Sequence, residues 1–209
     1  MTSRVARAAR RKSAPDRRAE IVAEATRLAL ADGIDQLTLR AVADRLGVVS
    51  SLVSHYFPAV DDLLVEAFRT AAQADSAQTY AQVEQAGDPV AGLRTMLRLT
   101  ISEERDRIST LWLGAWYAGR KRPVLHAEVT AEMGRDIERL SALIERGRAG
   151  GALHTDDPDA SAIRILAVTD GLSIQAVMRS TVDYRAVREL VFTVAERELG
   201  LPEGALGGD

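Results

Sequence analysis

The feature that most constrains this chain is a pair of short amphipathic segments joined at a glycine, within residues 36–57. Four apolar residues at helical spacing form one face of the first segment: Leu39, Val42, Ala43 and Leu46. Gly47 follows directly and can adopt the left-handed conformation that ends a helix. This order of helix, glycine turn and short helix predicts a helix-turn-helix. The alternative is an ordinary helical hairpin.

The second segment has the side chains expected of a helix that enters a DNA groove. Thr38 is predicted to cap the first helix, and Ser50 or Ser51 the second. The apolar side of the second helix is expected to be Val49, Val53 and Phe57, and Pro58 ends it. The opposite side carries small, polar or aromatic groups: Ser50, Ser51, Leu52, Ser54, His55 and Tyr56. No acid occurs in residues 47–60, so this face would not repel phosphates in a major groove.

The run LTLRAVADRLGVVSSLVSHYFPAVDDLLVEAF resembles the DNA-binding segment of the TetR family of bacterial transcriptional regulators. The matching features are Thr38, Ala43, Leu46-Gly47-Val48, the aromatic pair Tyr56-Phe57, and Leu63-Leu64. The run from Ser54 to Phe57 is most similar to the branch related to choline-responsive regulators of betaine synthesis. The resemblance is specific over about residues 17–70, and beyond them it covers only the general architecture.

The DNA contacts are assigned by position on the two helices. Thr38 at the start of the first helix and Tyr56 near the end of the second are candidates for phosphate contacts, and Arg40 on the outer side of its helix is placed to reach a guanine or a phosphate. The candidates for reading bases are Ser50, Ser51, Leu52, Ser54 and His55. Family members usually carry a phosphate-touching lysine where Val60 stands, threonine at Leu52 and tyrosine at Ser54. Base preferences are therefore not carried over to this chain.

The composition is that of an all-α protein with a basic beginning. Of the 209 residues 46% are hydrophobic and only 4% aromatic, and there is no cysteine, which fits a reducing cytoplasm. No apolar run reaches the length of a membrane span, and no secretory signal follows the basic start. Residues 1–60 contain ten Lys or Arg against six acids, a balance of +4, which leaves −7 for the rest of a chain of net charge −3. One end is expected to face a polyanion.

Three regions are expected along the chain. Residues 1–16 form a basic, flexible arm, which either reaches phosphates or the minor groove or is a solvated tail. Residues 17–60 form a three-helix, helix-turn-helix DNA-binding domain, and residues 61–203 a larger helical effector-binding and dimerisation domain. Helices are expected at about 15–31, 39–46, 50–57, 60–83, 89–102, 104–120, 124–147, 158–180 and 183–200, with no convincing strand. The resemblance implies a homodimer through the last two helices, the alternative being that their apolar stripes are monomer core.

The larger domain offers candidates for an effector pocket, which the resemblance also implies. Trp112 and Trp116 are four residues apart and so adjacent on one helix, with Tyr117 beside them. An aromatic pair could hold a cationic or flat ligand, although aromatics at this spacing also form ordinary cores. The further candidates are His126, Met133, Asp170, Gln175 and Met178.

These patterns argue against catalysis. There is no glycine-rich phosphate loop, and His55, His126 and His154 are too scattered for a metal motif, so no cofactor or metal is expected. The chain is predicted to be a ligand-responsive regulator, a repressor that binds a palindromic operator in double-stranded DNA as a dimer. The alternative is a helical small-molecule binding protein without sequence-specific DNA recognition. A salt titration separates the two, since phosphate contacts make affinity fall steeply with salt.

Overall fold

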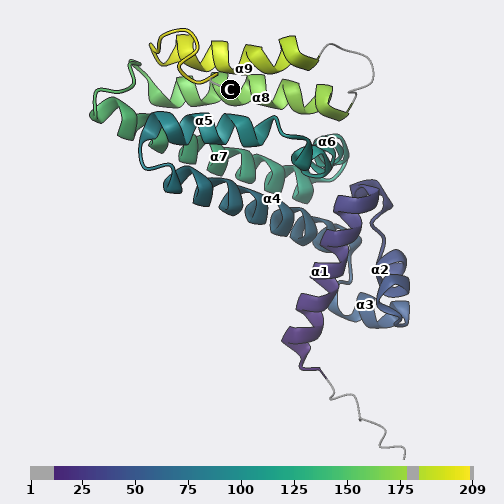
Figure 1. The fold of residues 1–209 in the computed structure, drawn as a ribbon. Coiled ribbons are helices and arrows are strands. Elements are labelled where there is room, and N and C mark those ends of the chain that lie inside the picture. Colours follow the sequence, from purple (N-terminus) through teal and green to yellow (C-terminus); the bar gives the residue numbers. More distant parts are fainter. Residues whose placement is uncertain (1–11, 178–183, 208–209) are drawn as a thin grey trace, which may run out of the picture.

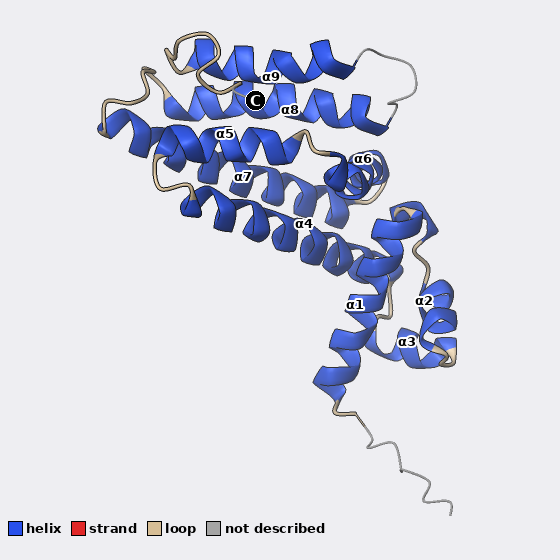
Figure 2. Cartoon of the chain, viewed as in Figure 1, coloured by secondary structure: helices blue, strands red, loops and turns tan. Residues whose placement is uncertain are grey.

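The computed structural model of the chain describes residues 12–177 and 184–207, without side chains for residues 173–188. The described residues are helical with connecting turns, and no strand occurs among them (Figure 2). No helix within these ranges is long and apolar enough to cross a membrane. The all-α architecture expected from the sequence is therefore confirmed.

The first three helices form a compact head at one end of the molecule (Figure 1). They are α1 (Ala14–Asp32), α2 (Leu39–Leu46) and α3 (Ser50–Tyr56), with a single 3₁₀ turn, η1 (Ile34–Gln36), between the first two. Ser13 caps α1, and proline stands in its first turn, where a missing N–H costs nothing. Helices α2 and α3 pack against each other and present α3 on the outside of the head.

The remaining helices form the body, and α4 joins it to the head (Figure 1). The body consists of α4 (Val60–Gln85), α5 (Pro89–Thr100), the 3₁₀ turn η2 (Glu103–Arg105), α6 (Asp106–Gly119), α7 (Pro123–Ala149), α8 (Pro158–Val177) and α9 (Tyr184–Glu198). Helices α8 and α9 pack side by side on the far side of the body from the head. The helices expected to begin at residues 89 and 158 do so, and each begins at an aspartate–proline pair. Asp88 Oδ1 accepts from the N–H groups of Val90 and Ala91, and Asp157 Oδ1 accepts from that of Ala160.

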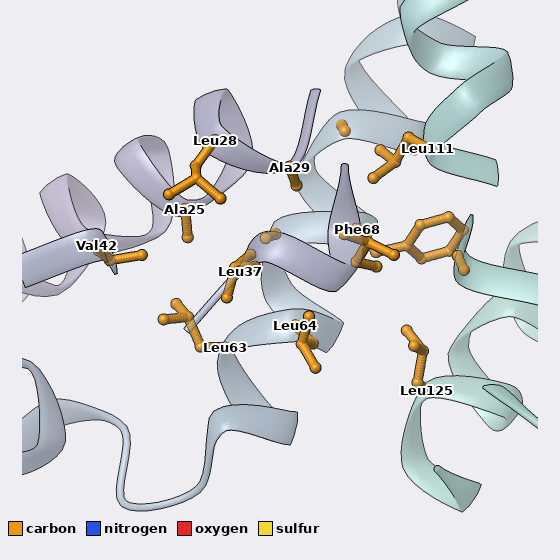
Figure 3. Close-up of a cluster of buried hydrophobic side chains, with 14 of the residues drawn as sticks. Ala25, Leu28, Ala29, Leu37, Val42, Leu63, Leu64, Phe68, Leu111 and Leu125 are labelled. Atoms are coloured by element: carbon orange, nitrogen blue, oxygen red, sulfur yellow. The ribbon is translucent and has the colours of Figure 1, made fainter. Parts of the chain in front are cut away.

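The head does not have a hydrophobic core of its own. One cluster of buried side chains runs from α1–α3 through the first half of α4 into α6 and the start of α7 (Figure 3). It joins Leu28 and Val42 of the head to Phe68, Leu111 and Leu125, all of them almost completely buried. Because interiors are close-packed, a shift of α6 or α4 is felt directly by the head. A domain boundary at residue 60 remains a prediction, and it would cut through this cluster.

A second cluster fills the other end of the body, between α4, α5, α7, α8 and α9. The residues after α9 fold back over it. The buried carboxylate of Glu196 accepts from the backbone N–H groups of Gly204 at 3.1 Å and Leu206 at 2.7 Å. Arg94 Nη2 donates to the carbonyl of Ala205 at 2.6 Å, so the last described residues are fastened to both α5 and α9.

Candidate functional site

The turn between α2 and α3 is built by two residues that the sequence identifies. Thr38 caps α2, and its Oγ1 accepts from the N–H of Ala41 at 3.0 Å. Gly47 ends α2 with φ 66° and ψ 33°, in the left-handed region that costs other L-residues about 1–2 kcal/mol. Its N–H bonds back to carbonyls of the last turn, so the chain reverses within three residues and starts α3.

Helix α3 turns its predicted polar face outward. Val53 and Phe57 are buried and anchor the helix to the head, as predicted. Ser50, Ser51 and His55 are exposed, while Leu52, Ser54 and Tyr56 are half-buried. Two of these groups are held locally, because Ser54 Oγ donates to the carbonyl of Ser50 at 2.7 Å and the Tyr56 ring packs edge-on against His55. The six candidate residues are thus brought onto one helix, and their contacts with DNA remain a prediction.

The start of α3 differs from the prediction. The cap residue is Val49, and no side chain caps the helix, so Ser50 and Ser51 are its first two helical residues. The prediction that Val49 belongs to the apolar side is wrong, because its side chain is 69% exposed. As the cap residue, Val49 has an extended backbone conformation (φ −74°, ψ 142°), so it does not continue the helical face of Val53 and Phe57. Sequence reasoning therefore missed an exposed apolar group at the N-terminal end of α3.

Most cations described in the head already have acidic partners. Lys12 and Arg17 pair with Glu20, Arg45 pairs with Asp32, and Arg18 pairs with Glu66 of α4. Arg40 is highly exposed, and its Nε lies 3.8 Å from Asp44 Oδ2, a loose contact that is easily exchanged for a phosphate. Four basic residues of the predicted arm, at positions 4–11, lie outside the described residues.

The body contains a cavity of about 200 Å³ between α4, α5, α6, α7 and α8. Its lining is Asp75, Ser76, Thr79, Tyr80, Met96, Thr100, Arg105, Ser109, Trp112, Trp116, Met133, Asp136, Ile137, Ile163, Leu166, Ala167, Thr169 and Asp170. Four of the predicted effector-binding residues are brought together here: Trp112, Trp116, Met133 and Asp170.

Other predicted residues lie elsewhere. Tyr117 follows Trp116 on α6 but points outward, with 72% of its surface exposed, and His126 is exposed on α7. Neither lines the cavity. For Tyr117 the reason is that a helical step of one residue from Trp116 turns the side chain to a different face. The side chain of Gln175 and the whole of Met178 lie outside the described residues.

Two tryptophans form the aromatic wall of the cavity. The ring centroids of Trp112 and Trp116 are 5.9 Å apart at an interplanar angle of 54°, which confirms their predicted adjacency. Trp112 also packs edge-on against Phe68, with centroids 4.8 Å apart, so it links the cavity wall to the core shared with the head. The Nε1 of Trp116 is buried and has no hydrogen-bond partner in the described part of the chain.

Three carboxylates face the cavity, and they differ in their partners. Asp75 Oδ2 lies 2.7 Å from Arg105 Nη2. Asp136 accepts from Ser76 Oγ at 3.0 Å and lies 3.7 Å from Arg139 Nη1. No hydrogen bond or ion pair connects Asp170 with any group among residues 12–177 and 184–207 whose side chains are described. Asp170 is therefore the free anion of this cavity.

Burial raises the pKa of each of these three carboxyl groups. Desolvation raises the pKa of Asp170 to about 6, and the nearby charge of Asp136 adds to the effect. Desolvation also raises the pKa values of Asp75 and Asp136, although an arginine next to each acts in the opposite direction. Sequence reasoning missed Asp75, Asp136 and Arg105, because a polar residue on an amphipathic helix normally indicates the solvated face.

The cavity is suited to binding an organic molecule rather than to coordinating a metal ion. Within the described ranges no group of three His, Asp or Glu side chains is placed to hold a metal ion. The outward face of α3 and the cavity are formed by different helices, and Trp112 and Trp116 of the cavity lining pack against the core that the head shares with α4 and α6. This is the arrangement of a protein with a DNA-reading head and a separate small-molecule site.

Comparisons with known proteins agree with this geometry. Residues 21–67 match the family model of "Bacterial regulatory proteins, tetR family", and residues 89–200 match that of "BetI-type transcriptional repressor, C-terminal". Among curated proteins no match is found. Solved structures show the same fold at low identity, and three of them illustrate its spread.

A transcriptional regulator from Saccharomonospora viridis in complex with choline is 22% identical, with a TM-score of 0.75 over 88% of this chain and 98% of that one. A TetR transcription regulator from Haloarcula marismortui is 22% identical, with a TM-score of 0.76 over 88% and 99%. The fatty acid degradation regulator FadR from Bacillus halodurans is 17% identical, with a TM-score of 0.67 over 94% and 97%. Because the family models account for both the head and most of the body, the chain belongs to the TetR family and is a ligand-responsive, DNA-binding transcriptional regulator.

Proposed function

We propose that this regulator is a homodimeric repressor that binds a palindromic operator and is released by a small organic cation. The single observation that carries the ligand class is the cavity, in which the unpaired carboxylate of Asp170 lies near two tryptophans. A buried carboxylate without a partner is costly, and a ligand that supplies the positive charge removes that cost.

The DNA contacts follow from the outer face of α3. Ser50, Ser51, Leu52, Ser54 and His55 read base edges, and Thr38, Arg40 and Tyr56 hold phosphates. Val49 adds an apolar group suited to a thymine methyl. Because the described cations of the head are largely paired with acids, the basic arm supplies much of the phosphate attraction.

The homodimer uses the last two helices. On α8 a stripe of exposed residues is apolar or small, and it includes Ile163, 51% exposed, and Ala167. On α9 Leu190 is 50% exposed. Apolar groups of this kind on an outer helix pair are expected at a subunit interface. A twofold dimer places two α3 helices at half-sites one helical turn or more apart, which accounts for a palindromic operator.

The effector is small and carries a positive charge. Asp170 provides the counter-ion and the indole rings of Trp112 and Trp116 provide faces for cation–π contact. The related regulator from Saccharomonospora viridis, of the same fold, is described in complex with choline. Choline is accordingly a suitable first probe for this cavity of about 200 Å³.

Helix α6 transmits the effect of the ligand to the head. One side of α6 carries Trp112 and Trp116 into the cavity, and another carries Leu111 and Ala115 into the shared core. Gly114 lets η1 approach closely, since a Cβ there would lie 3.0 Å from Ile34 Cγ2. A ligand that binds better to a shifted α6 changes the spacing of the heads and weakens operator binding.

Selection of random duplexes on the purified full-length protein tests this function. The proposal predicts an enriched palindrome, bound by one dimer, with an affinity that falls steeply between low and moderate salt. Removal of residues 1–11 is expected to flatten that salt dependence without changing the enriched sequence. Weak binding to every duplex alike would refute the repressor and leave only a ligand-binding protein.

A further inference from the structure

The effector cavity already contains a cation that belongs to the chain. Arg105 lies in η2, directly before α6. Its Nη2 is 2.7 Å from Asp75 Oδ2, and its Nη1 donates to Thr79 Oγ1 at 2.9 Å. All three side chains line the cavity, and both partners belong to α4. The guanidinium of Arg105 is thus paired with the carboxylate of Asp75, with which a bound cation could otherwise pair.

The charges around Arg105 favour the binding of a second cation in the cavity. Besides Asp75, the charge of Asp136 lies close enough for Arg105 to lower its pKa. Burial nevertheless raises the pKa of Asp75, even with Arg105 in contact. The lining therefore holds three carboxylates and one arginine, so a cation that enters meets an excess of negative charge.

The position of Arg105 makes its partner important for α6. It is the residue before the first turn of α6, and it reaches across the cavity wall to α4. Helix α4 continues into the head, and α6 packs on the core shared with the head. The contact between Arg105 and Asp75 consequently fastens the start of α6 to the helix that carries the head.

We propose that Arg105 is an internal competitor of the effector. A cation that enters the cavity displaces the guanidinium from Asp75 and so detaches the start of α6 from α4. This inference rests on the proposed function, since it presupposes a cationic effector in this cavity. It also gives Arg105 a part in specificity, because weakly bound cations fail to displace a guanidinium held by two partners.

Two substitutions change the competition in opposite directions. Arg105→Gln frees Asp75, so choline is expected to bind about fivefold more tightly, the value of one partly exposed ion pair. Asp75→Asn removes the carboxylate and leaves the guanidinium unpaired in the cavity, so choline is expected to bind about fivefold more weakly. Both substitutions remove the ion pair between Arg105 and Asp75 of α4, and both are expected to lower operator affinity without ligand.

Calorimetric titration with choline, together with operator titration of the same preparations, tests the proposal. Arg107→Gln is the matched control, because Arg107 is an exposed arginine two residues further on and has no ion pair in the described part of the chain. It should leave choline affinity unchanged. A merely structural role for Arg105 predicts weaker choline binding in both variants, whereas internal competition predicts opposite shifts.

The outcomes separate this inference from the proposed function. Failure of the wild type to bind any operator refutes the repressor, while the choline titrations still decide the role of Arg105. Unchanged or weaker choline binding by Arg105→Gln overturns internal competition, as does an Arg105→Gln protein that, like the wild type, binds no choline. If Arg105→Gln does not fold, Arg105→Lys takes its place, because an ammonium group that cannot hold Asp75 and Thr79 together should again allow tighter choline binding, and unchanged or weaker binding would again overturn internal competition.

Discussion

Replacement of Asp170 by asparagine tests the chemistry of the cavity most sharply. The substitution keeps the size of the side chain but removes the only carboxylate of the cavity without a described partner. At about 4 Å and an effective dielectric constant of about 20, attraction between two unit charges is about 4 kcal/mol. Lost hydration offsets much of this, so a net effect of about 1.4–2.8 kcal/mol, a loss of about 10- to 100-fold in choline affinity, is expected.

The pKa of Asp170 adds a pH signature to the same experiment. With a pKa of about 6 the carboxylate is ionised at about pH 8, and only about a tenth of it at about pH 5. Choline affinity of the wild type is thus expected to fall about tenfold between these values, and Asp170→Asn should remove this part of the fall. The remainder in the variant reports Asp75 and Asp136, whose pKa values are also raised.

Calorimetric titrations at both pH values measure the effect. The neutral carbon isostere of choline, in which a tert-butyl group replaces the trimethylammonium group, serves as the matched ligand. Its binding should respond to neither pH nor the substitution. Equal loss of affinity for both ligands in Asp170→Asn would refute the electrostatic reasoning and indicate a change of cavity shape.

Four further predictions concern stability, the turn, base reading and assembly. The folded pKa of Asp170 is raised above its unfolded value, so its contribution to stability is complete below about pH 4, where the side chain is protonated, and is lost as the pH rises through about 6. Asp170→Asn should therefore raise the free energy of unfolding at neutral pH by about 1–3 kcal/mol, measured by urea titration. Gly47→Ala should lower the free energy of unfolding by about 1–2 kcal/mol through the strained left-handed backbone alone, since nothing lies within 4 Å of the new methyl group. Gly134→Ala within α7 should raise it by up to about 1 kcal/mol in the same assay, because alanine has the higher helix propensity. Val49→Ala should relax preference at one base pair of each half-site in duplex selection, and a selection identical to that of the wild type would exclude Val49 from base reading. Leu190→Arg should convert the dimer to a monomer in sedimentation velocity and weaken operator binding, and an unchanged dimer would place the interface elsewhere.

The helical frame was predictable because its signals are local. Thr38, Gly47 and the two aspartate–proline pairs act within one turn of chain, and the structure places helix starts or ends at each of them. The start of α3 was not predictable in the same way. The pattern favours Ser50 or Ser51, whose hydroxyl groups can cap a helix, whereas the structure starts α3 directly after Val49 without a side-chain cap.

The cavity was only partly predictable, because it depends on helices distant in sequence. Trp112 and Trp116 stand out in a chain poor in aromatics, and their spacing alone makes them neighbours. Asp75 and Arg105 look like ordinary surface residues until the fold brings η2 against α4. The sharing of one core between head and body was also invisible, since an apolar stripe does not name the helix on which it packs.

The most direct test of the account is the affinity for the selected operator, measured with and without saturating choline. If a cation in the cavity shifts α6, choline should weaken operator binding at least about fivefold, and operator DNA should weaken choline binding by the same factor. The neutral isostere should leave operator affinity nearly unchanged. Operator affinity that stays constant while choline demonstrably occupies the cavity would contradict the coupling between the cavity and the head.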